Sequence, residues 1–321
     1  MRSLLRILIA SALVIAVLFV IAAVLVRQPL YARVKAVPAR ADAARLRAHV
    51  DFLTTTTPAR NADHPERLLA AAQYIAGLFR ESGAVVEEQD YEASGRTYRN
   101  VIGHYGPRNG QVLIIGAHYD AFGAGADLPG ADDNASGTAG LLELARLLGR
   151  AQITKPVTLV AFSTEEPPFF ASEHMGSAVH AASLAHSGRP VAGMICLEMI
   201  GYYADEQQWE PKLLSLLYPK HGDFIGVAGG WRDRKLARQV KAALNAAGAN
   251  AVSFTGPRSL LDASDQRNYW ARGWPAVIIT DTAYLRNPNY HMAGDTADTL
   301  DYTRMARIVE GLLTAIVRLR D

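Results

Sequence analysis

Residues 111–137 read QVLIIGAHYDAFGAGADLPGADDNASG, and this stretch decides the fold. It begins as an apolar run and then places His118 and Asp120 two residues apart. A Gly-rich loop follows, and the stretch ends with Asp132 and Asp133 in front of a helical pattern. A continuous apolar run predicts a strand that is buried on both faces. The polar residues that come after it predict a site at the end of that strand.

Similar apolar runs recur along the chain, and helical stretches lie between them. The predicted buried strands are 112–117, 157–162, 191–197, 224–228 and 276–280, and the predicted helices are 137–148, 234–247 and 302–318. Ahead of them, a helical pattern begins at Asp42 and breaks at 54–58. A second helix is expected with Asp63 as its N-cap and an end near Gly83. The alternating segments 85–91 and 98–105 are expected to pair across a turn. This order predicts α/β, a three-layer α/β/α sandwich with a mixed, largely parallel central sheet. In such sheets, sites form outside the carboxyl ends of the strands.

The N-terminus carries a second strong signal. Residues 7–26 form an uncharged apolar run between Arg6 and Arg27, long enough to cross a hydrocarbon core of about 30 Å as a helix. A cleavable signal peptide is the alternative, but its apolar region is usually about 7–15 residues long. The nearest Ala-x-Ala, at 39–41, also lies well beyond the run. We therefore expect a short tail at 1–6, an uncleaved signal anchor at 7–26, a linker at 27–41 and one catalytic domain at 42–321.

The orientation of this anchor is predicted from two opposing signals. Four Arg or Lys residues lie between 27 and 40, whereas only Arg2 and Arg6 precede the run, and the positive-inside rule would then place the body in the cytoplasm. A very short N-terminal tail, however, is typical of a signal anchor. We therefore expect a single-pass membrane protein whose catalytic domain is extracytoplasmic, in the periplasm or outside the cell.

Charge, cysteine content and loop spacing exclude several classes of protein. The formal net charge of +2 is too small to indicate a nucleic-acid partner. The one cysteine, Cys196, excludes an intrachain disulfide and a Cys-based zinc site. The loop glycines Gly123, Gly125 and Gly130 do not have the spacing of a dinucleotide-binding loop. The loop also holds Asp127, Asp132 and Asp133, whose carboxylates would repel a pyrophosphate. No Gly-Lys-Ser/Thr follows, which excludes a P-loop.

The loop offers metal ligands instead. His118 and Asp120 can lie on one side of a strand end, where the carboxylate could hold one imidazole nitrogen and leave the other for a metal. Taken alone, this pair would more often be ordinary surface residues. Asp132 and Asp133 alone would more often be acidic residues that favour a helix N-terminus.

Further candidates also follow apolar runs or lie in loops. Glu165 and Glu166 come directly after a predicted strand and directly before two prolines, which disfavour helix and let adjacent side chains diverge. Glu198 follows another apolar run, and His291 lies in the loop NPNYHMAGDTADT. Singly, each could be a solvated surface residue.

Counting ligands favours two metal ions over one. A closed tetrahedral zinc accepts four ligands, and the chain offers five. If one Asp bridges two ions, the five side chains provide six contacts, three to each ion. A shared water then fills the fourth coordination position of each. Three carboxylates against two Zn²⁺ also leave a charge that a hydroxide neutralises. The five candidate ligands are His118, Asp133, Glu166, Glu198 and His291.

These residues lie in segments that resemble a known family. The segments GAHYD, PGADDNASGTAGLLELARLL, FSTEEPPFFASEHMGS, LEMIGYY and TDTAYLRNPNYHMAGDTADTLDY extend from Gly116 to Tyr302. Together they resemble the co-catalytic zinc aminopeptidases, a family that also contains glutamate carboxypeptidases and glutaminyl cyclases. The resemblance implies that Glu165 is the general base and that Asp120 supports His118. It implies Asp133 as the bridging ligand, His118 and Glu198 for one zinc, and Glu166 and His291 for the other.

Two positions depart from the family pattern. Many members carry Asp where this chain has Glu198, and its longer arm could alter the spacing of the metals. Members often show Ser-Asp-His where this chain has Ser264, Asp265 and Gln266, so a role of that His does not carry over.

The resemblance implies a membrane-anchored aminopeptidase with two Zn²⁺ ions. A zinc-bridging water would attack the first peptide bond of a peptide with a free N-terminus, and Glu165 would take its proton. Three alternatives stay open: a glutaminyl cyclase with one zinc, a carboxypeptidase, and a non-catalytic binding ectodomain. A carboxypeptidase would need a cationic pocket, for which the sequence offers Arg232, Arg258, Arg267 and Arg272. The expected partners are the peptide substrate and, through residues 7–26, a lipid bilayer.

Overall fold

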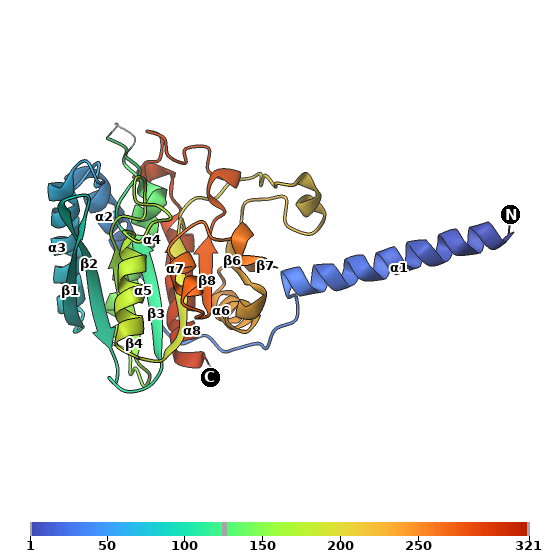
Figure 1. Ribbon diagram of the computed structural model, residues 1–321, viewed down its shortest axis with the longest axis horizontal. Helices are drawn as coiled ribbons and strands as arrows, with labels where there is room; N and C mark the ends of the chain where they lie inside the picture. The colour runs from blue at the N-terminus through green and yellow to red at the C-terminus, as the bar shows by residue number, and fades with distance from the viewer. Residues whose placement is uncertain (1, 124–126, 320–321) are drawn as a thin grey trace.

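The computed structural model describes residues 2–123 and 127–319 (Figure 1). Gly125, and Met1 of the expected N-terminal tail, therefore lie outside the described residues. The strands are β1 (Val85–Ala93), β2 (Arg96–Tyr105), β3 (Val112–His118), β4 (Val157–Phe162), β5 (Val191–Glu198), β6 (Ile225–Gly230), β7 (Ala251–Gly256) and β8 (Ala276–Thr280). The α-helices are α1 (Arg2–Arg27), α2 (Ala43–Asp51), α3 (Pro65–Glu81), α4 (Gly137–Leu148), α5 (Gly176–His186), α6 (Arg234–Ala246), α7 (Gln266–Ala271) and α8 (Tyr302–Arg318).

All eight strands form one mixed sheet in the order β1-β2-β4-β3-β5-β8-β6-β7. The central strands β4, β3, β5 and β8 run parallel to one another, and β6 and β7 form a further parallel pair. The pairs β1–β2, β2–β4 and β6–β8 are antiparallel. The predicted mixed, largely parallel sheet is confirmed. Every residue of β3 and β4 is buried, as their continuous apolar sequence predicts.

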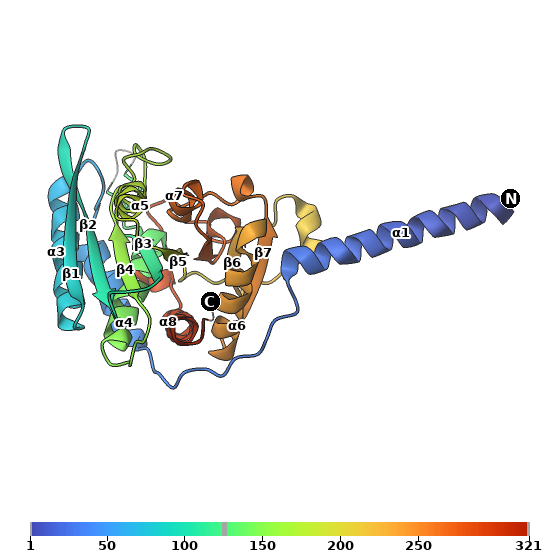
Figure 2. The same ribbon diagram turned by 60° about the horizontal axis from the view of Figure 1, so that its bottom comes forward.

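Helices cover both faces of this sheet and complete the three layers (Figure 2). Side chains of α2, α3, α4, α6 and α8 pack in one large apolar core against one face. A smaller core on the other face contains residues of α5 and α7, among them Ala181, Tyr269 and Trp270. The predicted α/β/α sandwich is therefore confirmed, although strand β7 and helices α5 and α7 were not among the predicted elements.

The N-terminal helix stands apart from these layers (Figure 1). Helix α1 begins at Arg2 and so includes most of the segment that was expected to be a separate tail. Residues Arg6–Arg27 have the length and composition of a membrane span, which a signal sequence near the N-terminus also has.

The segment between α1 and α2 has no regular secondary structure, but it lies on the body of the protein. The backbone N–H of Val37 donates to Thr314 Oγ1 at 3.1 Å, and that of Ala41 donates to Glu310 Oε1 at 3.1 Å. Both partners belong to α8. The linker is therefore irregular, as expected, and it is also held along much of its length.

Candidate metal centre

The candidate ligands meet at the carboxyl edge of the central strands. His118 is the last residue of β3, and Glu198 is the last residue of β5. Strand β4 ends at Phe162, and Glu166 lies in the short segment that follows it. Asp133 lies in the irregular turn η2 (Ala131–Ser136) in front of α4, and His291 lies in the loop between β8 and α8. The parallel order of β4, β3 and β5 thus brings together residues that are far apart in sequence.

These residues form two groups that share Asp133. In the first group, His118 Nε2 lies 3.4 Å from Asp133 Oδ1 and 3.2 Å from Glu198 Oε2. In the second, His291 Nε2 lies 3.1 Å from Asp133 Oδ2 and 3.4 Å from Glu166 Oε1. Within each group, one potential ligand atom of each residue lies within 4.8 Å of the others. The two oxygens of Asp133 thus face two different histidines.

Several of these atoms are buried and lack a hydrogen-bond partner. Asp133 Oδ1, Glu166 Oε1 and His291 Nε2 are all in this state. A buried polar atom without a partner costs free energy, so a native structure normally satisfies it with protein, water or an ion. Imidazole nitrogen and carboxylate oxygen are ligands that Zn²⁺ accepts. The residues present therefore fit one zinc ion in each group.

Asp120 connects the two groups through the backbone. Its carboxylate accepts hydrogen bonds from the N–H of Glu165 at 3.1 Å and from the N–H of Glu166 at 3.0 Å. Its Oδ1 also lies 3.4 Å from His118 Nδ1, while that nitrogen is 3.1 Å from the carbonyl oxygen of Asp120 itself. The carboxylate lies near the imidazole, as expected, but the shorter contact of Nδ1 is with the carbonyl oxygen, and the carboxylate accepts from the two peptide N–H groups instead.

Three residues at this edge adopt left-handed backbone conformations that are uncommon outside glycine. The φ angles are 58° for Thr164, 51° for Met199 and 58° for His291. Each such residue costs on the order of 1–3 kcal/mol and needs support from its surroundings. Thr164 Oγ1 donates to the carbonyl of His174 at 2.7 Å, and Met199 N–H donates to Asn134 Oδ1 at 3.1 Å. Two of the strained residues are therefore sequence neighbours of Glu165 and Glu198, and the third is His291 itself.

The imidazole of His291 is held between two aromatic rings. The ring of Phe122 stacks on it with centroids 4.0 Å apart, and that of Tyr290 with centroids 3.8 Å apart. This stacking fixes the plane of a side chain that comes from a loop. It therefore directs Nε2 towards Asp133 and Glu166 without help from a strand.

Burial and charge oppose each other in this cluster. Burial raises the pKa of Glu165 well above its usual range, and that of Glu166 to about 7. Burial would lower the pKa of His291, but its contacts with Asp133 and Glu166 outweigh this and raise it to about 9. Burial likewise opposes ionisation of Asp133, yet its close contacts with both histidines lower its pKa. The carboxylates therefore require nearby positive charge to stay ionised.

Other residues hold the ligands in place, and sequence reasoning missed them. The carboxylate of Asp295 accepts the N–H of Asp132 at 2.9 Å and the N–H of Asp133 at 3.1 Å. Ser264 Oγ donates to Glu198 Oε2 at 2.6 Å. Asp132 itself accepts from the N–H of Gly201 at 3.0 Å, which agrees with its expected place beside the ligand. The only signal in the sequence was the position of Ser264 in the Ser-Asp-Gln segment.

A cavity of about 450 Å³ opens beside the two groups. Of the four arginines that were considered for a cationic pocket, Arg267 lines it. Its guanidinium lies 3.8 Å from Asp262 Oδ2 and 4.9 Å from the ring centroid of Phe170. Arg258 instead pairs with Asp233 at 2.7 Å. The side chain of Gln266 is buried and donates to the carbonyl of Leu261 at 2.7 Å.

Comparisons with known proteins show the family of this chain. The model of peptidase family M28 matches residues 100–316. The uncharacterized protein YfbL of Escherichia coli (strain K12) is 45% identical over 316 residues, which are 95% of this chain and 97% of that protein. A probable zinc metalloprotease of Leptosphaeria maculans is 28% identical over 225 residues, which are 62% of this chain and 51%, about half, of that protein.

Solved structures share the fold. The LapA aminopeptidase of Legionella pneumophila matches with a TM-score of 0.71 at 17% identity, over 87% of this chain and 72% of that one. A glutaminyl cyclase of Bacteroides thetaiotaomicron matches with a TM-score of 0.65 at 20% identity, over 88% and 99%. Fold, histidine–carboxylate groups and family match together define a zinc metallopeptidase. The chain belongs to peptidase family M28.

Proposed function

We propose that this chain is a membrane-anchored aminopeptidase that uses two zinc ions. The observation that carries the proposal is the position of Asp133, whose two oxygens face His118 and His291 at 3.4 and 3.1 Å. A carboxylate in this position suits a bridge between two ions. His118 and Glu198 would hold one zinc, and Glu166 and His291 would hold the other. When bound, zinc supplies Lewis acidity, which lowers the pKa of a coordinated water and polarises a carbonyl.

Glu165 is the proposed general base. Its carboxylate lines the cavity, and its Oε2 lies 3.9 Å from His118 Nε2, so it is next to the first group without belonging to either set of ligands. It would take a proton from the attacking water and give it to the leaving amine. Asp120 fixes the peptide N–H groups of Glu165 and Glu166 and so keeps the base and one ligand in register.

The charge of the cavity favours a substrate amine over a substrate carboxylate. Bound zinc would balance the ligand carboxylates, so the other charged residues on the described wall are Glu165 and Asp262 against Arg267, which lies 3.8 Å from Asp262. A protonated α-amine would be attracted to this wall, and a C-terminal carboxylate would be repelled by most of it. This balance supports cleavage at the N-terminal residue.

One experiment tests the proposal. Bound zinc per chain is measured on the purified protein, and the protein is assayed in parallel with aminoacyl amides, N-blocked peptides and peptides that begin with Gln. We expect two zinc ions per chain, and hydrolysis only where the α-amine is free. One zinc per chain with pyroglutamate as product would replace the proposal by a glutaminyl cyclase. Cleavage of N-blocked peptides from their C-terminus would replace it by a carboxypeptidase.

We also propose that α1 is retained as an anchor and that the body is extracytoplasmic. Contacts at its C-terminal end support retention. Lys241 Nζ donates to the carbonyls of Arg27 at 2.9 Å and Gln28 at 2.7 Å, and Val26 packs against Trp209 and its neighbours. Alkaline extraction of membranes tests the anchor, since a cleaved body would be released. Protease protection in spheroplasts tests the orientation.

A further inference from the structure

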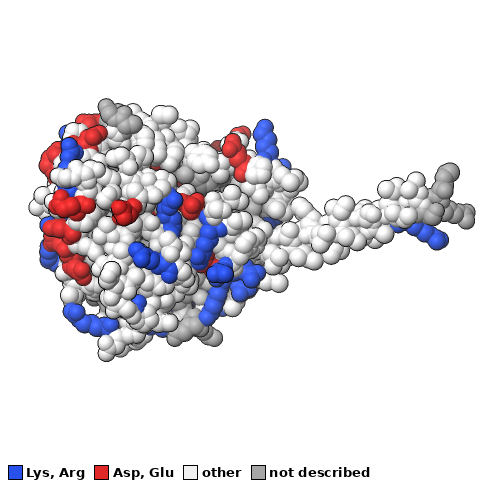
Figure 3. Space-filling view, in the orientation of Figure 1, with Lys and Arg blue, Asp and Glu red and all other residues white. Residues whose placement is uncertain are grey.

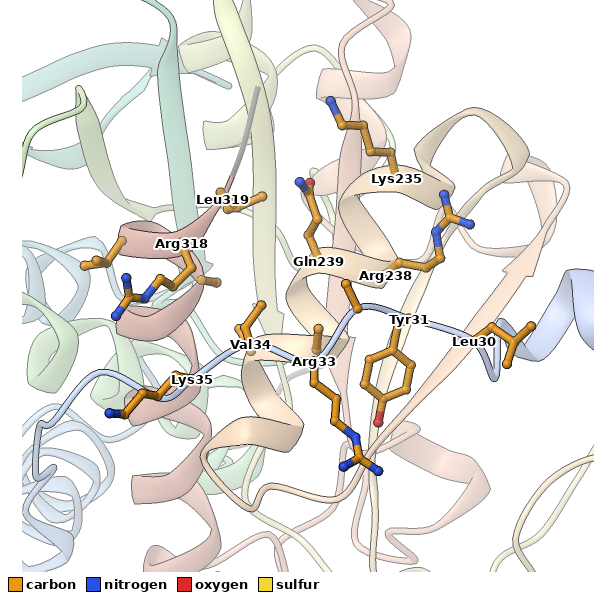
Figure 4. Close-up of a pocket in the computed structure, with 15 residues that line it drawn as sticks. Leu30, Tyr31, Arg33, Val34, Lys35, Lys235, Arg238, Gln239, Arg318 and Leu319 are labelled. Carbon is orange, nitrogen blue, oxygen red and sulfur yellow. The ribbon is translucent and has the colours of Figure 1, made fainter.

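A groove of about 850 Å³ lies outside the metal centre, between the linker, α6 and the end of α8 (Figure 4). Its apolar part includes Val34 of the linker and Leu319 after α8. Every charged residue among the described ones that line it is a cation, and all three segments contribute. These cations are Arg33, Lys35, Lys235, Arg238 and Arg318.

The cations surround the apolar part. In Figure 4, the charged ends of Lys35 and Arg318 lie on one side, and those of Lys235 and Arg238 lie on the other, with Val34 and Leu319 between them. Among residues 2–123 and 127–319, the structure records no ion pair between these five cations and a carboxylate. Some basic side chains elsewhere have a carboxylate partner, as Arg258 has Asp233. An apolar floor with a cationic rim suits an anionic amphiphile better than a small soluble anion.

The groove begins where α1 ends. The same helix that contributes Lys235 and Arg238 also contributes Lys241, which holds the carbonyls of Arg27 and Gln28. Lys241 comes six positions after Lys235 in this α-helix, a rise of about 9 Å along the axis. If α1 crosses a bilayer, the groove therefore lies within reach of its headgroups.

A second feature lies on the same side of the body. The turn η3 (Lys212–Leu216) projects beside the base of α1 in Figures 1 and 2. Its Leu213 and Leu216 are 66% and 67% exposed. The segment that carries it packs against α1, because Val26 contacts the cluster of Trp209, Tyr218 and Phe224. Two exposed leucines at this place suit the apolar edge of a bilayer.

We propose that this side of the body is a lipid-docking face, and that the groove binds the headgroup of an anionic phospholipid. The phosphate would lie at the cationic rim, the glycerol and upper acyl chain would lie on the apolar floor, and η3 would enter the interface. The visible face in Figure 3 agrees, since Lys and Arg gather towards α1 and most Asp and Glu lie at the far end. The inference rests on the proposed anchoring by α1.

The test uses the full chain in neutral detergent with equal amounts of phosphatidylglycerol and phosphatidylcholine. Native mass spectrometry counts the lipids that stay bound to the wild type, to Arg238→Glu/Arg318→Glu and to the control Arg150→Glu/Arg272→Glu. All four positions are exposed, and the two variants change the net charge equally. We expect the wild type and the control to retain phosphatidylglycerol, and the groove variant to lose about tenfold or more of that preference. Equal retention by all three proteins would overturn the proposal.

Two further arms separate the alternatives. Inorganic phosphate is added to the same mixture; if it displaces the lipid completely, the groove is a soluble-anion site and the lipid assignment is wrong. Flotation with vesicles of pure phosphatidylcholine tests α1 alone, so failure of the anchor is distinguished from failure of the groove. Thermal unfolding of the groove variant must match that of the control. If it does not, Lys35→Gln/Lys235→Gln replaces it, and this variant should also lose preference for phosphatidylglycerol.

Fluorescence quenching tests whether the leucines of η3 enter the bilayer. A fluorophore is placed on Leu213→Cys in a Cys196→Ser background, and brominated lipids in nanodiscs quench it if η3 enters the bilayer. The same fluorophore on Val85→Cys is the control, because Val85 is 52% exposed on the edge strand at the other end of the sheet. We expect quenching at position 213 alone. Equal quenching at both positions, or none at 213, would remove η3 from the docking face.

Discussion

Glu165 and Glu166 are neighbours in sequence, but their carboxylates face different histidines. Glu165 Oε2 lies 3.9 Å from His118 Nε2, and Glu166 Oε1 lies 3.4 Å from His291 Nε2. This divergence was expected from the two prolines that follow them. It allows adjacent residues of one type to have different tasks, one as a ligand and one as a base.

The first prediction concerns these two residues. Glu165→Gln should keep both zinc ions and lose about 10²–10⁴-fold in kcat, because the amide cannot accept the proton of the attacking water. Zinc content and steady-state kinetics measure this. Glu166→Gln is the matched control and should lose zinc from one group. Substantial turnover by Glu165→Gln at full zinc content would remove Glu165 as the base.

The second prediction concerns Asp295, a positioning residue. Asp295→Asn retains only one acceptor oxygen for the N–H groups of Asp132 and Asp133, so the bridging carboxylate should be held less well. Zinc affinity, measured by competition with a chelator, should fall about 10–100-fold, and added zinc should restore part of the activity. Asp298→Asn, in the same loop but with a carboxylate that accepts from Thr296 Oγ1, should behave as wild type. Unchanged zinc affinity in Asp295→Asn would contradict this role.

The candidate ligands could be proposed from sequence, and the residues that contact and hold them could not. His118, Glu166 and Glu198 each follow an apolar run, which marks the end of a buried strand. Asp295 and Ser264 lie in loops without such a mark. Their contacts depend on how loops pack over the sheet edge, and no local pattern encodes that.

Helices and strands whose apolar residues recur at one clear spacing were predicted well, and elements of mixed composition were not. Helices α4 and α8 begin and end as predicted, because their apolar residues recur at helical spacing. Strand β7, AVSFTG, contains Ser, Thr and Gly and follows a helix after a short connection, so its strand signal is weak. Helix α5, GSAVHAASLAH, buries few large side chains. Both depend on tertiary packing for their definition.

One predicted helix start was wrong in detail. Asp63 was expected to cap α3, but the helix begins at Pro65 with His64 in the N-cap position and no side-chain cap. The backbone N–H of Asp63 instead donates to Asn61 Oδ1 at 3.0 Å. The turn before the helix therefore uses Asn61, which shifts the start by one residue.

The third prediction concerns the packing of α5 on α7. His180 Nδ1 lies 2.7 Å from the hydroxyl of Tyr269, and burial lowers the pKa of His180 to about 3. The unfolded chain takes up this proton near its usual pKa of about 6.5, so stability is complete above that pH and is lost towards pH 3. Between pH 7.5 and 5.5 the free energy of unfolding should fall by about 1.4 kcal/mol through this residue.

Denaturant unfolding at both pH values, with saturating zinc, measures the effect. His180→Gln should show a smaller fall than wild type by that amount. His186→Gln, exposed on the same helix, should show the wild-type fall. Equal falls in all three proteins would mean that His180 is protonated in the folded state.

At the scale of the whole molecule, the buried negative charge of the metal centre matters for stability. Asp133, Glu165, Glu166 and Glu198 are all buried within one cluster. Burial and mutual repulsion raise the pKa of Glu198, and a divalent cation would relieve both. The folded state should therefore depend on metal for part of its stability.

The fourth prediction follows from this dependence. Removal of zinc by a chelator should lower the melting temperature by roughly 5–15 °C, because binding to the folded state alone stabilises it by mass action. Two equivalents of zinc should restore it, and magnesium should not. Differential scanning calorimetry measures the shift. A melting temperature that does not change on complete removal would contradict metal binding at these residues.

The fixed exit of α1 has a consequence for how substrates arrive. Lys241 and Val26 join the end of this helix to the body, and α1 runs across the direction of the strands (Figures 1 and 2). With α1 across a bilayer, the strands would run along the membrane surface, and their carboxyl edge would open sideways. The active site would then stay at a fixed distance from the membrane surface. Peptide N-termini that diffuse along the membrane would reach it more readily than those that approach from the bulk solution.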